Sequence, residues 1–512
     1  MVSRDPNAAP ESQHAHRNHQ SEGCGTCTKR RIRCDLARPF CQKCVKRGLE
    51  CPGYGQRLRW AGGVAVRGRL KGKMIPLPQG GDLTNTPQPT PHHVSATASK
   101  DEVDGVDEVQ RHAGSPSVCL SMPLDLTLRS SSPEFIDYYD KNLAGLMVWF
   151  DSEENDYRRR VLPLATSTPA VRYAVAAIAA HHGASTFSLG MPRFPEAARD
   201  ACLGLINRHV QNMTERLADG SELNTGTDIA EAEWILASIL MISCYEMTNS
   251  QVAAAEGHKR AARALVNVFT TKEASNRDLF RFLRTQLSIY DVLASTTSFN
   301  LQDIHETVLP PPGTEHGLFS QYLSLLHFVT LLSRRAAFGL DATCNGLAPG
   351  NSPDATLIRC QFEQARGATL LAAGKLRIEP AIVRRDFVRL VDIYHHTAVL
   401  YSYRCLGYAH DGNLDWKASV ERLFEQLDAL EDPTPCAHNL PWPAFIAGAE
   451  CHDDVGKQQA VTNLLTDITK TTGFKNHADI LNFLSVFWGG TNPDWRPLAQ
   501  QFQEKGDQVL PV

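Results

Sequence analysis

The sequence has no apolar run long enough to cross a membrane. A membrane-spanning helix needs about 20 consecutive apolar residues, whereas the best candidate, residues 234–244, is short and has Glu231, Glu233 and Glu246 at its ends. We therefore expect this segment to be a buried core helix, and we expect no association with a membrane.

Residues 1–20 also lack the apolar stretch of a secretory signal, because they are polar and rich in histidine. A chain without such a signal is expected in a reducing compartment. There, cysteines are metal ligands or thiols more often than disulfides. This distinction matters because the chain contains 14 cysteines.

Signatures of the common enzyme classes are absent as well. We find no glycine-rich phosphate loop, no G-x-S-x-G turn and no H-E-x-x-H motif. The histidine pairs at 181–182 and 395–396 fall on apolar helical patterns, where core positions are more common than ligands. The Cys-His-Asp-Asp segment at 451–454 has no partner motif that would complete a metal site. We therefore expect no enzymatic activity and no catalytic residue.

Charge is distributed unevenly along the chain. Residues 1–75 contain 16 Lys and Arg against 5 Asp and Glu, a net charge of +11, whereas the whole chain has a formal net charge of −4, so the remainder carries −15. A basic N-terminal part on an acidic body is typical of a segment that meets a polyanion. From charge alone, a basic tail without structure is the alternative.

A chain of 512 residues is too long for one compact domain, and its composition changes along its length. Residues 1–20 predict a disordered leader, and residues 21–60 are dense in Cys, Lys and Arg. Residues 61–132 are rich in proline and nearly without aromatic side chains, which predicts a disordered linker. Residues 133–512 predict a large all-α domain, because apolar residues recur there at helical spacing and no period-two run lies between hairpin turns.

Six cysteines in the second region follow a regular spacing. The pattern is Cys24-x2-Cys27-x6-Cys34-x6-Cys41-x2-Cys44-x6-Cys51. Zinc prefers four thiolates at about 2.3 Å in a tetrahedron, so six thiolates satisfy two Zn2+ ions only if two sulfurs bridge them. The symmetry of the spacing indicates the first cysteine of each half, Cys24 and Cys41, as the bridges. A disulfide framework and a different zinc fold are the alternatives.

This pattern resembles the fungal Zn2Cys6 binuclear zinc cluster family of transcription factors. Between Cys27 and Cys34 lies a basic run, Thr-Lys-Arg-Arg-Ile-Arg, similar to the first helix of that family. Asp35 follows the third cysteine, and Pro39 stands two residues before the fourth, where the family's loop carries a proline. The resemblance implies a small Zn2Cys6 cluster domain over residues 21–60 that holds two zinc ions and binds double-stranded DNA.

The basic run suggests how this domain would bind DNA. A short basic helix can enter the major groove, where Lys or Arg donates to guanine O6 and N7. The resemblance implies that Arg30 and Arg31 contact the bases and that the site contains CGG-like triplets. Phosphate contacts position such a domain without specifying sequence. The candidates for them are Lys29, Arg33, Lys43, Lys46 and Arg47.

The segment after the last cysteine bears on dimer formation. Residues 52–60 resemble the tail of one branch of these regulators. Many members of the family dimerise through a coiled coil behind the cluster, but residues 61–132 contain no apolar heptads and too many prolines for one. We therefore expect any homodimer to use another surface.

Residues 133–512 resemble the regulatory domain that accompanies this cluster in fungal transcription factors. The blocks that carry the resemblance are 162–165 with 173–182, 245–262, 290–292, 442–450 and 488–495. The resemblance implies a nuclear protein that acts with the transcription machinery and regulates RNA polymerase II transcription of a metabolic or secondary-metabolite gene set. A scaffold or corepressor acting through the helical domain is the alternative. The sequence does not indicate target genes, the direction of regulation, an effector or the half-site spacing.

Overall fold

The computed structural model divides the chain into two compact units, Met1–Ala96 and Thr97–Val512, which we describe separately. The residues that it describes are 26–27, 30, 32–35, 41–47, 49, 58–61, 75–78, 124–184, 193–223, 225–269, 272–314, 317–337, 354–410 and 412–512. The predicted leader, residues 1–20, lies outside the described residues, as do most of those predicted as a linker.

In the first unit, the described residues form one short helix and one pair of strands. Helix α2 spans Gln42–Val45. The strands β1 (Leu58–Ala61) and β2 (Ile75–Pro78) are antiparallel, with Leu58 opposite Pro78. The strand pair was not expected from the sequence, because each segment has only 4 residues and prolines within β2 argue against a strand.

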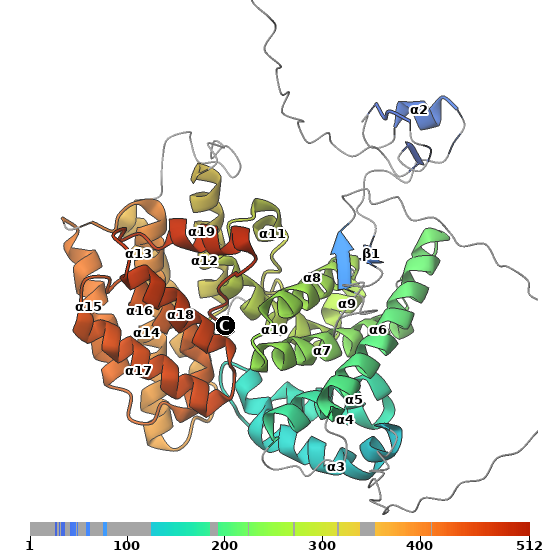
Figure 1. The fold of residues 1–512 in the computed structure, drawn as a ribbon, viewed down its shortest axis with the longest axis horizontal. Helices are drawn as coiled ribbons and strands as arrows, with labels where there is room; N and C mark the ends of the chain where they lie inside the picture. Colours follow the sequence, from blue (N-terminus) through green and yellow to red (C-terminus); the bar gives the residue numbers. More distant parts are fainter. Residues whose placement is uncertain are drawn as a thin grey trace, which may run out of the picture. The chain divides into compact units, whose positions relative to one another are not determined.

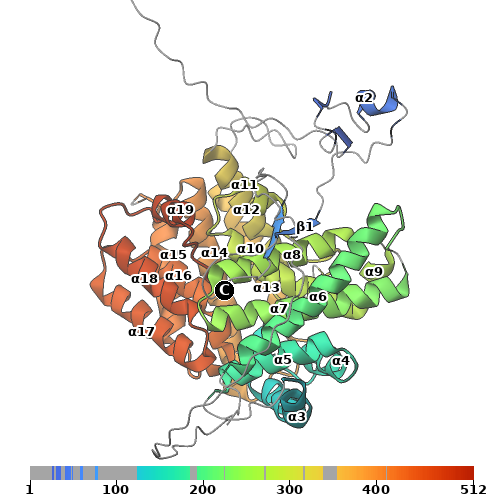
Figure 2. The same ribbon diagram turned by 45° about the vertical axis from the view of Figure 1, so that its right-hand side comes forward.

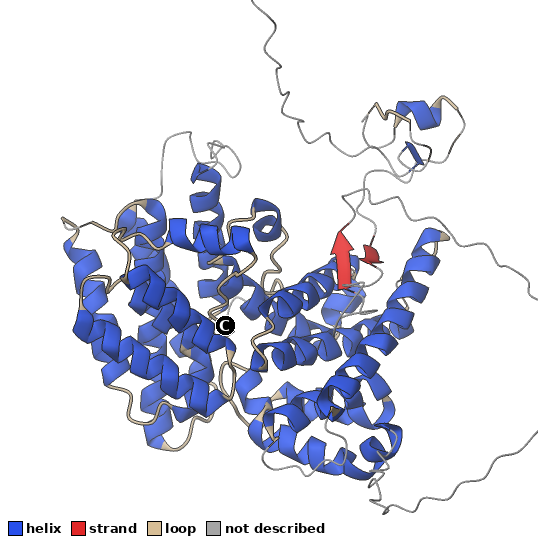
Figure 3. Cartoon of the chain, viewed as in Figure 1, coloured by secondary structure: helices blue, strands red, loops and turns tan. Residues whose placement is uncertain are grey.

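The described residues of the second unit contain helices and no strand (Figure 3), which confirms the all-α prediction. Its first helix begins at Leu124, within the segment predicted as a linker. The helices are α3 (Leu124–Asn142), α4 (Leu162–Ser167), α5 (Pro169–His182), α6 (Phe194–Ala218), α7 (Gly226–Thr248), α8 (Val252–Val268), α9 (Lys272–Asn276), α10 (Asp278–Ser295), α11 (Leu301–His305), α12 (Ser320–Ala337), α13 (Ala355–Ala373), α14 (Ala381–Leu406), α15 (Leu414–Asp428), α16 (Pro441–Ala449), α17 (Val455–Thr472), α18 (Asn476–Trp488) and α19 (Arg496–Lys505). Shorter helical turns are η1 (Ala144–Met147), η2 (Tyr157–Val161) and η3 (Thr434–Asn439).

Helices close in sequence pack against each other, as short connections favour. The first group, from α3 to α10, is built around α5, which contacts α3, α6 and α7, and around α7, which also contacts α8. The second group, from α12 to α19, is built around α14, which contacts α12, α13, α15 and α16. Contacts between α10 and α12 join the two groups, which lie side by side in both ribbon views (Figures 1 and 2).

Helix α7 confirms the prediction of a buried core helix at residues 234–244. Its start is fixed by a capping box: the Thr225 hydroxyl accepts from Asp228 N at 3.2 Å, and the Asp228 carboxylate accepts from Thr225 N at 3.0 Å. From Ile235 to Thr248 every side chain is buried. Because neighbouring helices surround α7, its apolar residues need no amphipathic pattern.

We find no single helix among the described residues that is long and apolar enough to cross a membrane. Two consecutive helical segments, Tyr157–Ser167 and Pro169–His182, reach the necessary length and composition only when they are taken together, and the chain bends by 117° between them. Most side chains of the second helix of this pair, α5, are buried inside the unit.

An aromatic cluster lies at the centre of the second group of helices. Trp149, from the segment after η1, packs against Phe319 and Tyr394 with ring centroids 4.3 and 5.2 Å apart. Tyr394 packs in turn against Trp442 at 5.7 Å. Such pairs contribute about 0.5–1.5 kcal/mol each beyond the burial of their area. The segment after η1 is therefore anchored in the second group.

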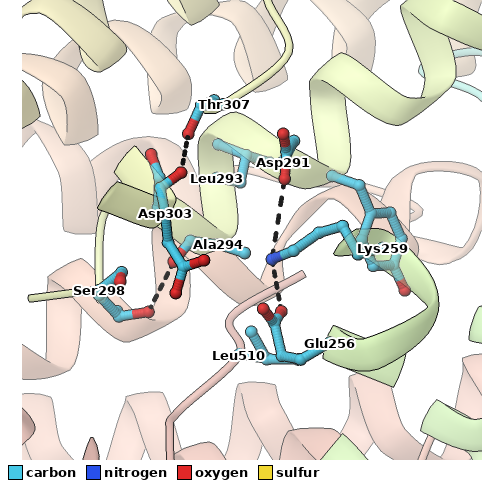
Figure 4. A network of polar contacts seen from close by, with 12 residues as sticks. Glu256, Lys259, Asp291, Leu293, Ala294, Ser298, Asp303, Thr307 and Leu510 are labelled. Atoms are coloured by element: carbon cyan, nitrogen blue, oxygen red, sulfur yellow. Dashed lines mark hydrogen bonds and ion pairs between the residues drawn. The ribbon is translucent and has the colours of Figure 1, made fainter. Parts of the chain in front are cut away.

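Buried charges near α10 are paired with each other instead of hydrated. The Asp291 carboxylate is fully buried and accepts from Arg263 Nε at 2.7 and 2.8 Å and from Val308 N at 2.7 Å. Lys259 lies between Glu256 and Asp291, 3.9 Å from an oxygen of the latter (Figure 4). Burial raises the pKa of Asp291, and the charges of Arg263 and Lys259 oppose this rise. The two cations therefore keep a buried carboxylate compensated.

We predict that Arg263→Met lowers the free energy of unfolding of the helical unit by about 3–5 kcal/mol, because the buried Asp291 carboxylate then loses its hydrogen-bonded cation and keeps only the more distant Lys259. Arg359→Met is the control, since Arg359 pairs with Asp415 at 2.9 Å while both side chains are 54% and 58% exposed. The control should change stability little, as exposed pairs are screened by water. Urea denaturation followed by circular dichroism measures both variants, and equal losses would contradict the prediction.

Candidate metal centre and DNA-contacting surface

Three of the predicted zinc ligands converge in the first unit. The sulfurs of Cys27, Cys41 and Cys44 all lie within 4.8 Å of one another. Cys27 Sγ is 3.6 Å from Cys41 Sγ and 3.9 Å from Cys44 Sγ. Four sulfurs placed tetrahedrally at about 2.3 Å from zinc would be about 3.8 Å apart. These three buried thiols therefore have the separation that a shared zinc ion requires.

Cys41 also belongs to a second group of possible ligands, with Cys34 and Asp35, whose ligand atoms again lie within 4.8 Å. It is thus close to sulfurs from both halves of the cysteine pattern. A sulfur in that position is suited to bridge two metal ions. Two further predicted ligands, Cys24 and Cys51, lie outside the described residues.

The backbone around the cluster repeats between the two halves. The carbonyl of Cys27 accepts from Ile32 N at 3.0 Å, and the carbonyl of Cys44 accepts from Leu49 N at 2.9 Å. Ile32 and Leu49 both pack against the cluster of cysteines. Each half therefore turns back after its second cysteine and covers the sulfurs with one apolar side chain. The sequence also reflects this repeat, because Lys-Arg occurs at 29–30 and again at 46–47.

Asp35 connects the two halves through the start of helix α2. Its carboxylate accepts from Gln42 N at 3.2 Å and from Lys43 N at 2.7 Å. Cys41, the residue directly before α2, makes no side-chain cap. Asp35 therefore satisfies backbone donors that the helix itself leaves unpaired. Sequence reasoning missed this role, although the position of Asp35 directly after Cys34 was a signal.

The predicted DNA-contacting residues that the structure describes are exposed. They are Arg30, Arg33, Lys43, Lys46 and Arg47. Lys43 Nζ also donates to the Arg33 carbonyl at 2.7 Å, so Lys43 makes a contact within the unit in addition to its predicted contact with a DNA phosphate. Lys29 and Arg31 lie outside the described residues. The described part of the unit therefore combines a buried set of thiols with a basic surface.

No other group of three Cys, His, Asp or Glu ligand atoms within 4.8 Å occurs in the described parts of the chain. The ring of His181 packs against Tyr245 at 5.4 Å, and the rings of His395 and His396 lie 5.1 Å apart. His452 packs against Phe487 at 4.9 Å. These histidines pack against other rings, as core histidines do.

Comparisons with known proteins identify the class. The model of the fungal specific transcription factor domain matches residues 134–344 and 362–505, and the model of the fungal Zn(2)-Cys(6) binuclear cluster domain matches residues 22–61. The chain therefore belongs to the fungal specific transcription factor family and carries a zinc-binding cysteine cluster at its N-terminal end. Both resemblances that the sequence suggested are confirmed. So is the prediction that the chain is a regulator of transcription and not an enzyme.

Individual relatives match over short segments. Arginine metabolism regulation protein II of Saccharomyces cerevisiae is 39% identical over 64 residues, which are 12% of this chain and 7% of that protein. Transcriptional regulatory protein moc3 of Schizosaccharomyces pombe is 44% identical over 50 residues, 10% of each chain. Acriflavine sensitivity control protein acr-2 of Neurospora crassa is 40% identical over 52 residues, 10% of this chain and 9% of that protein. The matches thus span a tenth or less of these relatives. No solved structure matches the chain.

We predict that Asp35→Ala weakens zinc affinity by about 10–100-fold, the usual effect of removing a group that supports metal ligands without binding the metal. The reason is that two backbone N–H groups at the start of α2 lose their acceptor. Gln42→Ala, on the same helix, is the control, because its exposed side chain has no such role. Competition with a chromophoric zinc chelator measures both affinities. The prediction fails if both variants hold zinc as tightly as the unchanged chain.

Proposed function

We propose that this protein is a nuclear, zinc-dependent transcription factor that binds specific DNA sequences and regulates RNA polymerase II transcription. The observation that carries the proposal is the convergence of Cys27, Cys41 and Cys44 within a unit whose described basic side chains are exposed. A metal-fixed scaffold with a basic surface is suited to bind DNA. Membership of the family supports the same function.

We propose that the cluster holds two Zn2+ ions between six thiolates. The ligands are Cys24, Cys27, Cys34, Cys41, Cys44 and Cys51. The proximity of Cys41 to ligands of both halves supports its role as a bridge, with Cys24 as its counterpart. Zinc bound there supplies most of the folding free energy of a domain of this size. The thiolates and Asp35 then hold the basic run in place.

In the proposed complex, Arg30 and Arg31 donate to guanines of CGG-like triplets, because guanine presents two acceptors in the major groove that a guanidinium matches. The remaining basic residues contact phosphates and position the domain. They are Lys29, Arg33, Lys43, Lys46 and Arg47. The exposure of the described members of this set supports the assignment.

We propose the following organisation for the chain: a leader (1–20), the cluster domain (21–60), a linker (61–132) and the regulatory domain (133–512). The last of these would contact the transcription machinery. The printed name of the Saccharomyces cerevisiae relative, which refers to arginine metabolism, supports a metabolic gene set as the target. Strands β1 and β2 occupy part of the segment behind the cluster, which supports a homodimer surface other than an adjacent coiled coil.

We predict that Arg30→Ala or Arg31→Ala costs about 1–3 kcal/mol of binding free energy on a duplex with CGG triplets and less on a scrambled duplex. Lys46→Ala is the control. Loss of a phosphate contact should weaken binding to both duplexes equally and reduce the salt dependence of binding by about one counterion. Fluorescence anisotropy at several salt concentrations measures these effects. Equal losses on both duplexes in the arginine variants would argue against base contacts.

We predict that exhaustive chelation of zinc abolishes binding to the CGG duplex, because the cluster domain loses the metal that folds it. Adding zinc back should restore binding. The helical unit serves as an internal control, since its circular dichroism signal should persist while binding is lost. DNA binding that survives complete removal of zinc would disprove a zinc-dependent mechanism.

A further inference from the structure

We propose that a cavity inside the helical unit binds a small, neutral molecule that offers both a hydrogen-bond acceptor and a hydrogen-bond donor, such as a small carboxamide. The cavity has a volume of about 100 Å³. Side chains of α7, α8 and α10 line it on one side, and those of α14, η3 and α16 line it on the other. This inference goes beyond the proposed function and does not depend on DNA binding.

The cavity lies where the two groups of helices meet. The end of the chain reaches the same place (Figures 1 and 2), and Val512 is part of the wall. Most of the wall is apolar. It includes Leu146, Leu240, Leu287, Leu293, Trp442 and Phe474. An engineered apolar cavity of roughly 150 Å³ holds a benzene molecule, so this smaller cavity is suited to a ligand no larger than benzene, such as a short-chain carboxamide.

Trp149 provides a hydrogen-bond donor in the wall. The residue is 7% exposed, and its Nε1 has no hydrogen-bond partner among the described residues. Because a buried indole N–H normally finds an acceptor, this position lacks an oxygen or nitrogen that a ligand could supply.

His438 provides a complementary acceptor. Its Nε2 lies 2.7 Å from the carbonyl oxygen of Val148, which can only accept, so Nε2 carries the proton. Burial lowers the pKa of His438 to about 4, which keeps the ring neutral near pH 7. Its Nδ1 is then a bare acceptor, buried and without a partner among the described residues.

Contacts with the backbone bring the segments that carry these two side chains together, and both side chains line the cavity. His438 binds the carbonyl of Val148, and the side chain of Asn439 donates to the carbonyl of Trp149 at 2.9 Å. Two consecutive residues of η3 therefore pair with two consecutive residues after η1. A carboxamide could accept from Trp149 with its carbonyl and donate to His438 with its N–H, and it would leave neither group unsatisfied.

The charges around the cavity favour a neutral ligand. Lys259 has the only charged side chain among the described residues of the wall, but it is already paired with Glu256 and lies 3.9 Å from Asp291. The wall therefore offers no uncompensated cation to an anionic ligand. Moving an anion into this site would cost its hydration without a matching partner.

The test uses propionamide as the probe, with isopentane and propionate for comparison, on the full zinc-loaded chain. The three molecules have nearly the same shape, but isopentane lacks both polar groups and propionate is charged. We expect propionamide to raise the Tm of the helical unit and to bind saturably in calorimetry. Isopentane should bind more weakly, and propionate should not bind. If none of the probes binds, the cavity takes up water only and the proposal is wrong.

Two tryptophan variants make the test specific. Trp149→Phe removes the donor and should weaken propionamide binding about tenfold while leaving isopentane binding unchanged. Trp495→Phe is the matched control, because Trp495 is fully buried and its Nε1 is also without a partner among the described residues, but it is not part of the cavity wall. It should change neither affinity. Equally weakened propionamide binding in both variants would overturn the proposal.

A third variant fills the cavity instead of changing its polarity. Ser243 is buried on α7 and lines the wall, so Ser243→Leu should abolish binding of propionamide and isopentane. Its Tm and circular dichroism, measured without probe, test whether it still folds. Unchanged propionamide binding in a folded Ser243→Leu chain would place the probe elsewhere and would also overturn the proposal.

Discussion

The convergence of cysteine sulfurs is the interaction on which the first unit depends. Thiolates repel one another unless a cation lies between them, and a small domain without a large core has little else to hold them together. In the described part of this unit, Ile32 and Leu49 are the apolar side chains that pack on the cysteines besides Cys34. The metal therefore performs the task of a core. For that reason the basic side chains can stay exposed, where they are available to a polyanion.

The helical unit is stabilised in the opposite way, by burial over a large area. Helix α7 is enclosed by its neighbours, and Trp149, Phe319, Tyr394 and Trp442 form a continuous aromatic cluster. A core of this size can also contain a charge such as that of Asp291, provided that cations accompany it. A large core also explains why the cavity can contain a donor and an acceptor without partners, because such groups persist inside a protein only where the rest of the core supports them. The stability of this unit has no connection to zinc.

The parts of the structure that could be predicted from the sequence are those determined by local spacing. Cysteines at fixed intervals indicate a metal cluster, and apolar residues at helical spacing indicate helices. The cap that Asp35 provides was missed because it joins residues from different halves of the pattern. The cavity could not be predicted at all, since Asn439 and Trp149, which help to build it, are 290 positions apart. Contacts at such a separation follow from the packing of whole helices and leave no short motif.

The two parts of the chain carry net charges of opposite sign. Residues 1–75 carry +11 and the remainder of the chain carries −15, so DNA attracts the first part and repels the second. A uniformly basic chain would bind DNA at many surfaces, mostly without regard to sequence. An acidic helical unit prevents this, because it confines contact with DNA to the cluster domain. The unequal charge therefore favours the N-terminal part of the chain as the part that meets a polyanion.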